Sequence, residues 1–140
     1  MKQINVYLGF NGKCREAMTF YKECLGGGEL NMQTVAESPV ADQMPPGFDK
    51  GQIMHSTLVK DGITIMGSDM SRGKSVNGNT VQICVHCSSA DEIKSIFSKL
   101  SEGGTIDDPL SEKFWGDTFG GLTDKYGKPW IFNYSKNQNQ

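Results

Sequence analysis

Hydrophobic residues follow two kinds of spacing in this chain, one typical of strands and one typical of helices. Residues 4–10 form a short apolar run that predicts a strand, and Asn11-Gly12 ends it. From Cys14 to Leu25 the apolar residues recur every three or four positions, which predicts a helix. Three consecutive glycines, residues 26–28, end this helix.

The same order of spacings occurs a second time. Residues 80–87 predict a strand, and residues 89–92 read Ser-Ala-Asp-Glu, a capping box that predicts a helix start. The predicted helix ends at Gly103-Gly104, and its apolar stripe consists of Ile93, Ile96, Phe97 and Leu100. Gly28 and Gly104 lie 76 positions apart, and the two helices match residue by residue at this offset.

Each helix is followed by a predicted hairpin. Residues 53–60 and 63–67 flank Asp61-Gly62, a pair that favours a two-residue turn. Residues 119–123 and 129–134 flank the turn at 124–127. The chain therefore predicts an α+β fold in a single domain, 1–140. It is built from two strand–helix–three-strand repeats, at about residues 1–72 and 78–135.

Charge and composition exclude several classes of function. The 140 residues carry a net charge of −2 and no basic cluster, so we expect no nucleic-acid partner. No apolar run approaches the roughly 18–20 residues of a membrane span, and the first residues lack the pattern of a signal peptide. We expect a cytoplasmic protein without a membrane partner. Its four cysteines, at positions 14, 24, 84 and 87, should then be reduced thiols.

The Cys84-x-x-Cys87 spacing resembles half of a zinc site. Both cysteines fall in a predicted strand, where residues three positions apart point to opposite faces. No second Cys/His pair at a matching distance follows. A zinc or redox role for this pair is therefore not expected.

The doubled unit resembles the vicinal oxygen chelate superfamily, which includes glyoxalase I, bleomycin-resistance proteins and extradiol dioxygenases. The resemblance is strongest to its PhnB-like branch, often labelled 3-demethylubiquinone-9 3-methyltransferase domains. It spans nearly the whole chain. It rests on the following motifs: residues 10–14 (FNGKC), Phe20-Tyr21 with Leu25-Gly26, His55, residues 67–69 (GSD), residues 114–117 (FWGD) and residues 123–130 (TDKYGKPW).

The resemblance implies two cup-shaped sheets of mixed or antiparallel strands, the glyoxalase/bleomycin resistance fold, completed in a homodimer. It also implies a divalent metal held by His and Glu from four strands. The repeat locates those four positions at or beside Val6, Met66, Gln82 and Ile131. None of these residues is a ligand for such an ion, so we expect no cofactor, with a divalent metal as the alternative.

His55 is the residue that keeps the metal question open. An Asp-Gly turn pairs Thr57 with Met66, and strand parity then places His55, Thr57 and Met66 on one face. By the resemblance, this face lines the cavity. His55 is accordingly a structural histidine satisfied by a neighbour, a ligand-binding or acid–base group, or a metal ligand.

Aromatic residues near the C-terminus divide between core and cavity. Trp130, Phe132 and Tyr134 alternate with Ile131 and should pack on a helix. Trp115 lies in a glycine-flanked segment and could contact a ligand at the cavity mouth. The cavity candidates are therefore His55, Thr57, Met66, Gln82, Trp115 and Ile131, and no catalytic residue is identified.

Three functions remain in competition. The first is a metal-free protein that binds a small molecule of unknown identity. The second is a metal-dependent lyase, isomerase or dioxygenase, an enzyme that would need a site built around His55. The third is a methyltransferase, which usually needs a glycine-rich turn from strand to helix for S-adenosylmethionine. Because residues 26–28 follow a helix instead, we regard that label as nomenclature.

Overall fold

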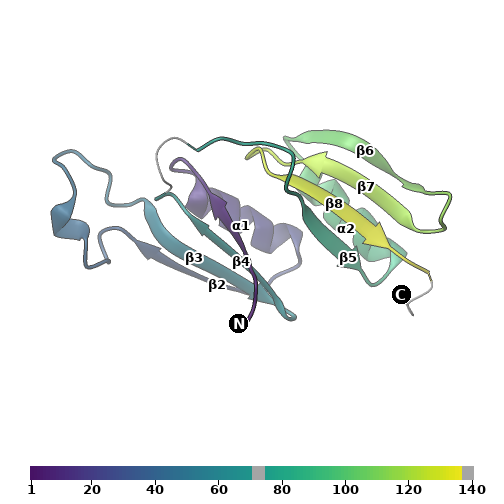
Figure 1. The fold of residues 1–140 in the computed structure, drawn as a ribbon, viewed down its shortest axis with the longest axis horizontal. Coiled ribbons are helices and arrows are strands. Elements are labelled where there is room, and N and C mark those ends of the chain that lie inside the picture. Colours follow the sequence, from purple (N-terminus) through teal and green to yellow (C-terminus); the bar gives the residue numbers. More distant parts are fainter. Residues whose placement is uncertain (71–74, 137–140) are drawn as a thin grey trace. The chain divides into compact units, whose positions relative to one another are not determined.

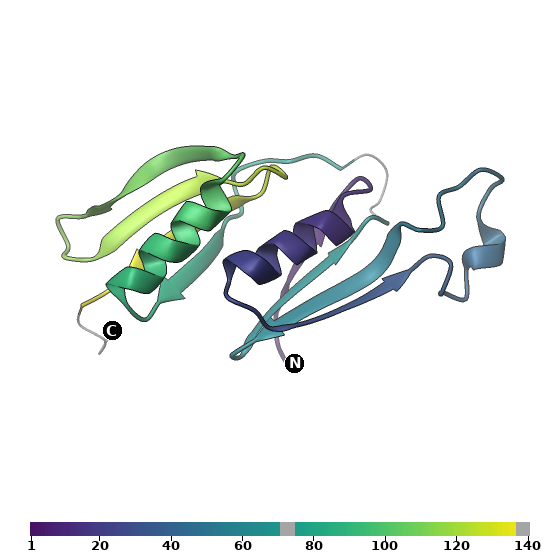
Figure 2. The ribbon, with the colours of Figure 1, turned by 180° about the vertical axis from the view of Figure 1, so that it is seen from behind.

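A computed structural model describes residues 1–70 and 75–136 and divides the chain into two compact units. Unit 1 is Met1–Ser75 and unit 2 is Val76–Gln140. Each unit contains one copy of the repeat, a four-stranded sheet with one helix across one of its faces (Figures 1 and 2). The predicted end of the first repeat at residue 72 lies outside the described residues.

The elements of unit 1 follow the predicted order. They are β1 (Val6–Gly9), α1 (Cys14–Cys24), β2 (Glu29–Thr34), a 3-10 turn (Ala41–Gln43), β3 (Ile53–Lys60) and β4 (Ile63–Ser68). The sheet order is β1-β4-β3-β2, in which β1 pairs with β4 in parallel and the other pairs are antiparallel. The first strand is shorter than the predicted residues 4–10, although the backbone N–H of Phe10 still donates to the Ser68 carbonyl.

Unit 2 repeats this topology. Its elements are β5 (Ile83–Cys87), α2 (Ala90–Ser101), β6 (Thr105–Glu112), β7 (Thr118–Thr123) and β8 (Pro129–Tyr134). The order is β5-β8-β7-β6, again with one parallel pair, β5 with β8. Both sheets are therefore mixed, and each unit pairs its first strand with its last. The strand predicted at residues 80–87 begins only at Ile83.

Turn and cap chemistry explain where several elements begin and end. Asp61 and Gly62 both have positive φ, 48° and 81°, as a two-residue hairpin turn of the predicted kind requires. Ser89 caps α2, because its hydroxyl accepts from the Glu92 N–H at 3.0 Å. The Glu92 carboxylate accepts from the Ser88 N–H rather than from the cap residue itself, a one-residue departure from the predicted capping box.

Each unit buries its own core between helix and sheet. In unit 1 the apolar face of α1, with Ala17, Met18 and Tyr21 fully buried, covers Leu58 and Ile65. In unit 2 the predicted stripe of α2 is buried, and the Phe97 ring meets the Phe132 ring edge-on at 5.3 Å. Trp130 and Phe132 are thus core residues, as their alternation with Ile131 predicts.

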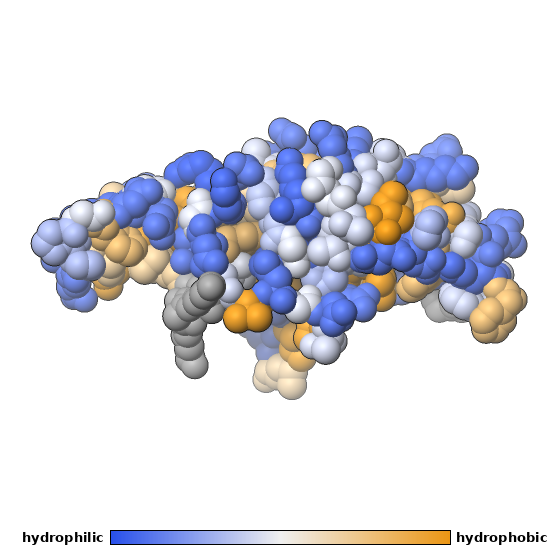
Figure 3. Space-filling view, turned by 90° about the horizontal axis from the view of Figure 1, so that it is seen from above, coloured by the Kyte–Doolittle hydropathy of each residue, from blue (hydrophilic) through white to orange (hydrophobic). Residues whose placement is uncertain are grey.

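No helix among the described residues is long and apolar enough to cross a membrane. Viewed from above, hydrophilic residues dominate the surface and hydrophobic residues are scattered among them (Figure 3). The four cysteines are free thiols, and of these Cys14, Cys24 and Cys87 are buried whereas Cys84 is exposed.

Candidate functional site

The sheet of unit 1 has one face covered by α1 and one face turned away from it, which we call the open face of unit 1. One row of side chains crosses the open face from strand to strand. It consists of Tyr7, Met66, Thr57 and Asn31, which are paired neighbours on β1, β4, β3 and β2. Their strand neighbours Leu58 and Ile65 are buried on the α1 side, so the row points the other way.

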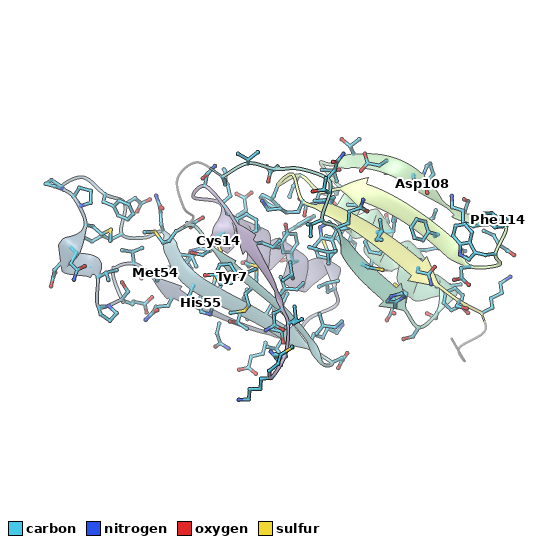
Figure 4. The ribbon with its side chains drawn as sticks, viewed as in Figure 1. Tyr7, Cys14, Met54, His55, Asp108 and Phe114 are labelled. Carbon is cyan, nitrogen blue, oxygen red and sulfur yellow. The ribbon has the colours of Figure 1, made fainter. Side chains whose placement is uncertain are left out.

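His55 lies beside this row and is held by its neighbours. Its Nε2 is 3.2 Å from the Thr57 hydroxyl, and its ring is 5.9 Å from the Tyr7 ring at an angle of 32°. Figure 4 shows Tyr7 and His55 near each other on this sheet. The Asn5 amide also donates to the Met66 sulfur at 3.8 Å. The open face thus offers hydroxyl, imidazole and amide groups beside an aromatic ring and a thioether.

The predicted register of the first hairpin is confirmed, since Thr57 pairs with Met66 and Lys60 with Ile63. The metal position predicted at or beside Val6 corresponds to its neighbour, Tyr7. Val6 pairs with the buried Ile65 and so points to the α1 side, whereas Tyr7 pairs with Met66 on the open face. The helices repeat at an offset of 76, whereas the equivalent first-strand residues Tyr7 and Cys84 lie 77 positions apart, so the offset of the helices does not carry over to the first strands.

The corresponding open face of unit 2 carries different chemistry. Its matching row is Cys84, Ile131, Gly121 and Asp108 on β5, β8, β7 and β6. Ile131 therefore occupies the place in unit 2 that Met66 occupies in unit 1. Gln82 lies before β5 and is exposed, and its amide donates to the Asn79 carbonyl at 3.4 Å. Cys84 rather than Gln82 stands opposite Ile131.

Trp115 lies on the turn between β6 and β7 of unit 2. Its side chain is 49% exposed, and its ring meets the Phe119 ring at 6.0 Å and the Phe114 ring at 4.9 Å. Trp115, Gln82 and Ile131 thus belong to unit 2, while His55, Thr57 and Met66 belong to unit 1. The structure brings the last three together on one face.

Two charged residues near Trp115 escaped prediction from the sequence. Lys113 and Asp108 form an ion pair at 3.1 Å, and the Asp108 Cβ would lie 4.0 Å from a Cβ added at Gly121, on the open face. Asp108 and Phe114 are both marked on this unit in Figure 4. The alternation of β6 alone could not reveal this placement, because its pairing with β7 is interrupted by two register shifts.

The side chains at the four inferred metal positions do not fit a divalent ion. In the observed register, one residue from Val6 and two from Gln82, they are the Tyr7 phenol, the Met66 thioether, the Cys84 thiol and the Ile131 alkyl chain. Such ions take carboxylate, imidazole and, in the case of zinc, thiolate ligands, and of these four side chains only the Cys84 thiol belongs to that set. Within residues 1–70 and 75–136, no group of three or more His, Cys, Asp or Glu side chains is placed to hold a metal ion.

The buried carboxylates of Asp69 and Asp124 serve the fold. Asp69 accepts from the backbone N–H groups of Gly12, Cys14 and Ile53 at 2.8–3.0 Å. Asp124 accepts from two backbone N–H groups of its own turn and from the Trp130 indole N–H at 2.8 Å. Both carboxylates therefore hold backbone or core groups of their own unit in place.

Comparisons with known proteins agree with this architecture. The family model for 3-demethylubiquinone-9 3-methyltransferase matches residues 2–132. Protein YjdN of Escherichia coli is 34% identical over 96% of this chain and 97% of its own length.

Solved structures show the same arrangement. The protein PA1353 of Pseudomonas aeruginosa is 35% identical with a TM-score of 0.84, over 96% of this chain and 98% of that one. A PhnB protein from Bacillus cereus is 28% identical with a TM-score of 0.77, over 96% and 100%. A glyoxalase/bleomycin resistance protein from Albidiferax ferrireducens, 15% identical, has a TM-score of 0.64 over 96% and 98%, and shows the fold alone.

Proposed function

This chain belongs to the 3-demethylubiquinone-9 3-methyltransferase-like family, whose PhnB-like members have the glyoxalase/bleomycin resistance fold, and from that premise we propose that it binds a small organic molecule. We place the ligand on the open face of unit 1, without a metal ion. The observation that carries the proposal is the cluster of Tyr7, His55 and Thr57 on a sheet face that no helix or strand among the described residues of unit 1 covers. A few polar groups set among apolar ones are what a small-molecule site requires.

His55 is the polar group on which binding should depend most. Its Nε2 contacts Thr57, and its Nδ1 has no hydrogen-bond partner among the described residues. A ligand atom can therefore bond to the imidazole without displacing an existing contact. The Tyr7 ring beside it supplies an apolar surface with a polar end.

Replacing His55 by alanine should weaken binding by about 0.5–1.5 kcal/mol, or about two- to twelvefold in Kd, because one hydrogen bond is lost. Native mass spectrometry of the purified protein would identify the co-purifying molecule, and calorimetric titration with that molecule would measure both affinities. Ser88→Ala is the control, because Ser88 is exposed beyond the end of β5 in unit 2. Equal binding by a folded His55→Ala variant and the wild type would contradict the assignment of this face.

Metal-dependent catalysis is the second candidate, and His55 is the observation that favours it. Elemental analysis of the same preparation distinguishes metal-free ligand binding from metal-dependent catalysis. Substoichiometric zinc, nickel, manganese and iron are expected for metal-free binding. One equivalent of any of them, lost in His55→Ala, would instead support a metalloenzyme.

The family's description names a methyltransferase, but the glycines of this chain are not placed as a turn for that enzyme's cofactor would usually need. Gly26, Gly27 and Gly28 connect α1 to β2, so they follow a helix and precede an antiparallel strand. The strand-to-helix connection between β1 and α1 contains the single glycine Gly12. S-adenosylmethionine usually binds a glycine-rich turn of the latter kind.

We also propose that the protein is a cytoplasmic homodimer. Each sheet ends in two edge strands, β1 and β2 in unit 1 and β5 and β6 in unit 2. Unpaired edges favour association with another chain. Sedimentation velocity should therefore give a dimer at micromolar concentration. A monomer whose sedimentation coefficient does not change with concentration would contradict this prediction.

A further inference from the structure

Cys84 and His86 form an exposed pair on the open face of unit 2, apart from the site described for unit 1. Both project from β5, two positions apart, so they share a face. The Cys84 sulfur is 3.6 Å from His86 Nε2. The other three cysteines are buried, with exposed fractions of 6% or less. Cys84 is thus the accessible thiol of the described chain, and a base stands beside it.

The surroundings of the pair are apolar or neutral. β8, the strand paired with β5, presents Ile131 next to Cys84 and Asn133 next to His86. β8 carries no Asp, Glu, Lys or Arg, and its Tyr134 pairs with Cys87. α2 packs on the opposite face, where the charge of Glu92 acts on Cys87. β8 therefore places no acidic group beside the pair, and the acidic residues Asp91 and Glu92 belong to α2, which packs on the other face of the sheet.

We propose that Cys84 and His86 are a thiol–imidazole pair that adds covalently to soft electrophiles, of which apolar α,β-unsaturated carbonyl compounds are the class that fits. The inference does not depend on ligand binding by unit 1. In the reaction His86 Nε2 takes the thiol proton, and the sulfur forms a bond to the β-carbon of the electrophile. The electron pair of the carbon–carbon double bond moves to the α-carbon, which then takes a proton from the imidazolium. No oxidant or reductant is needed.

At neutral pH the Cys84 thiol needs a base to remove its proton. Desolvation by the neighbouring atoms of the sheet raises the pKa of Cys84, although the residue itself is exposed. The thiolate is the nucleophilic form, so a raised pKa leaves less of it at pH 7. An adjacent base removes the proton during attack and offsets that deficit. The rate should then depend on His86 at pH 7 and become independent of it once the solution itself ionises the thiol.

N-ethylmaleimide is a suitable probe because it is an α,β-unsaturated carbonyl compound. In the native protein it should label one cysteine per chain, identified as Cys84 by peptide mapping, and label all four after unfolding in urea. Cys84→Ser should abolish native labelling. His86→Ala should slow it about tenfold at pH 7, which is less than the roughly hundredfold or more that a well-positioned base contributes, because the contact of 3.6 Å is long. Ser88→Ala, beyond the end of the same strand, should leave the rate unchanged.

Measuring the labelling rate at two pH values distinguishes base catalysis by His86 from a structural effect of the His86→Ala substitution. Wild type and His86→Ala should label at similar rates at pH 10, and added imidazole should restore the rate of the variant at pH 7. Equal rates at pH 7 would overturn the proposal. So would a loss of the same size at both pH values, absence of rescue by imidazole, or native labelling that begins at Cys14, Cys24 or Cys87.

Discussion

Replacing Asp69 by alanine should lower the free energy of unfolding by about 3–5 kcal/mol, because three backbone N–H groups lose their acceptor. Two of them, on Gly12 and Cys14, share the Asp69 Oδ1, and the third, on Ile53, bonds to Oδ2. Asp69 is 9% exposed, and Cys14 and Ile53 are buried, so water cannot readily replace the carboxylate. Chemical denaturation followed by circular dichroism would measure the loss.

Two further variants refine this prediction. Asp69→Asn keeps one oxygen for Gly12 and Cys14 but turns an NH₂ group toward the Ile53 N–H, so its effect should be intermediate. Asp49→Ala is the matched control, because the Asp49 carboxylate accepts from the exposed Gly51 N–H at 2.9 Å. It should change the unfolding free energy by no more than about 0.5 kcal/mol. A loss at Asp69 no larger than at Asp49 would show that its three hydrogen bonds contribute little.

Replacing Gly104 by alanine should destabilise unit 2 by about 2–3 kcal/mol, a value typical of forcing a carbon into occupied space. A Cβ at this position would lie 2.3 Å from the Thr123 carbonyl oxygen and 3.0 Å from two backbone atoms of Asp124. Because all three are backbone atoms, no change of side-chain rotamer can relieve the overlap. The backbone just before β6 or the end of β7 must move.

Gly78→Ala is the control for this substitution. Its backbone φ is not positive, and no atom lies within 4 Å of its added Cβ. The same denaturation measurement should therefore find Gly78→Ala within about 0.5 kcal/mol of the wild type. If Gly104→Ala were equally neutral, the close approach of Gly104 to the end of β7 would not be a constraint in solution.

The fold could be predicted because it depends on local patterns. Helical spacing in residues 14–25 and 89–100, glycine stops and the Asp61-Gly62 turn each fix one element within a few residues. Because the same order of strand, helix and three strands occurs twice, the architecture of two similar sheets could be predicted, and the likeness to a solved structure of this fold confirms it. Strand ends were less predictable, because residues such as Ile4 and Val81 are apolar yet exposed outside the strands.

The candidate site was only partly predictable, because it depends on register between distant strands. The turn at Asp61-Gly62 fixes the pairing of β3 with β4, so the shared face of Thr57 and Met66 followed from the sequence. The parallel pairing of β1 with β4 has no turn to fix it, so the sequence located the position on β1 only at or beside Val6, and the structure places Tyr7 there. Likewise, nothing in the sequence around Asp69 indicates that its carboxylate caps a helix 55 residues earlier.

The pairing of first strand with last has a consequence for synthesis on the ribosome. The sheet of unit 1 cannot close until β4, which ends at Ser68, has been made, because β4 lies between β1 and β3. From then on no strand of unit 1 needs a partner from unit 2, whose own sheet must wait for β8 near the C-terminus. The chain can therefore fold in two steps set by translation, with the first half assembled while the second is still being made.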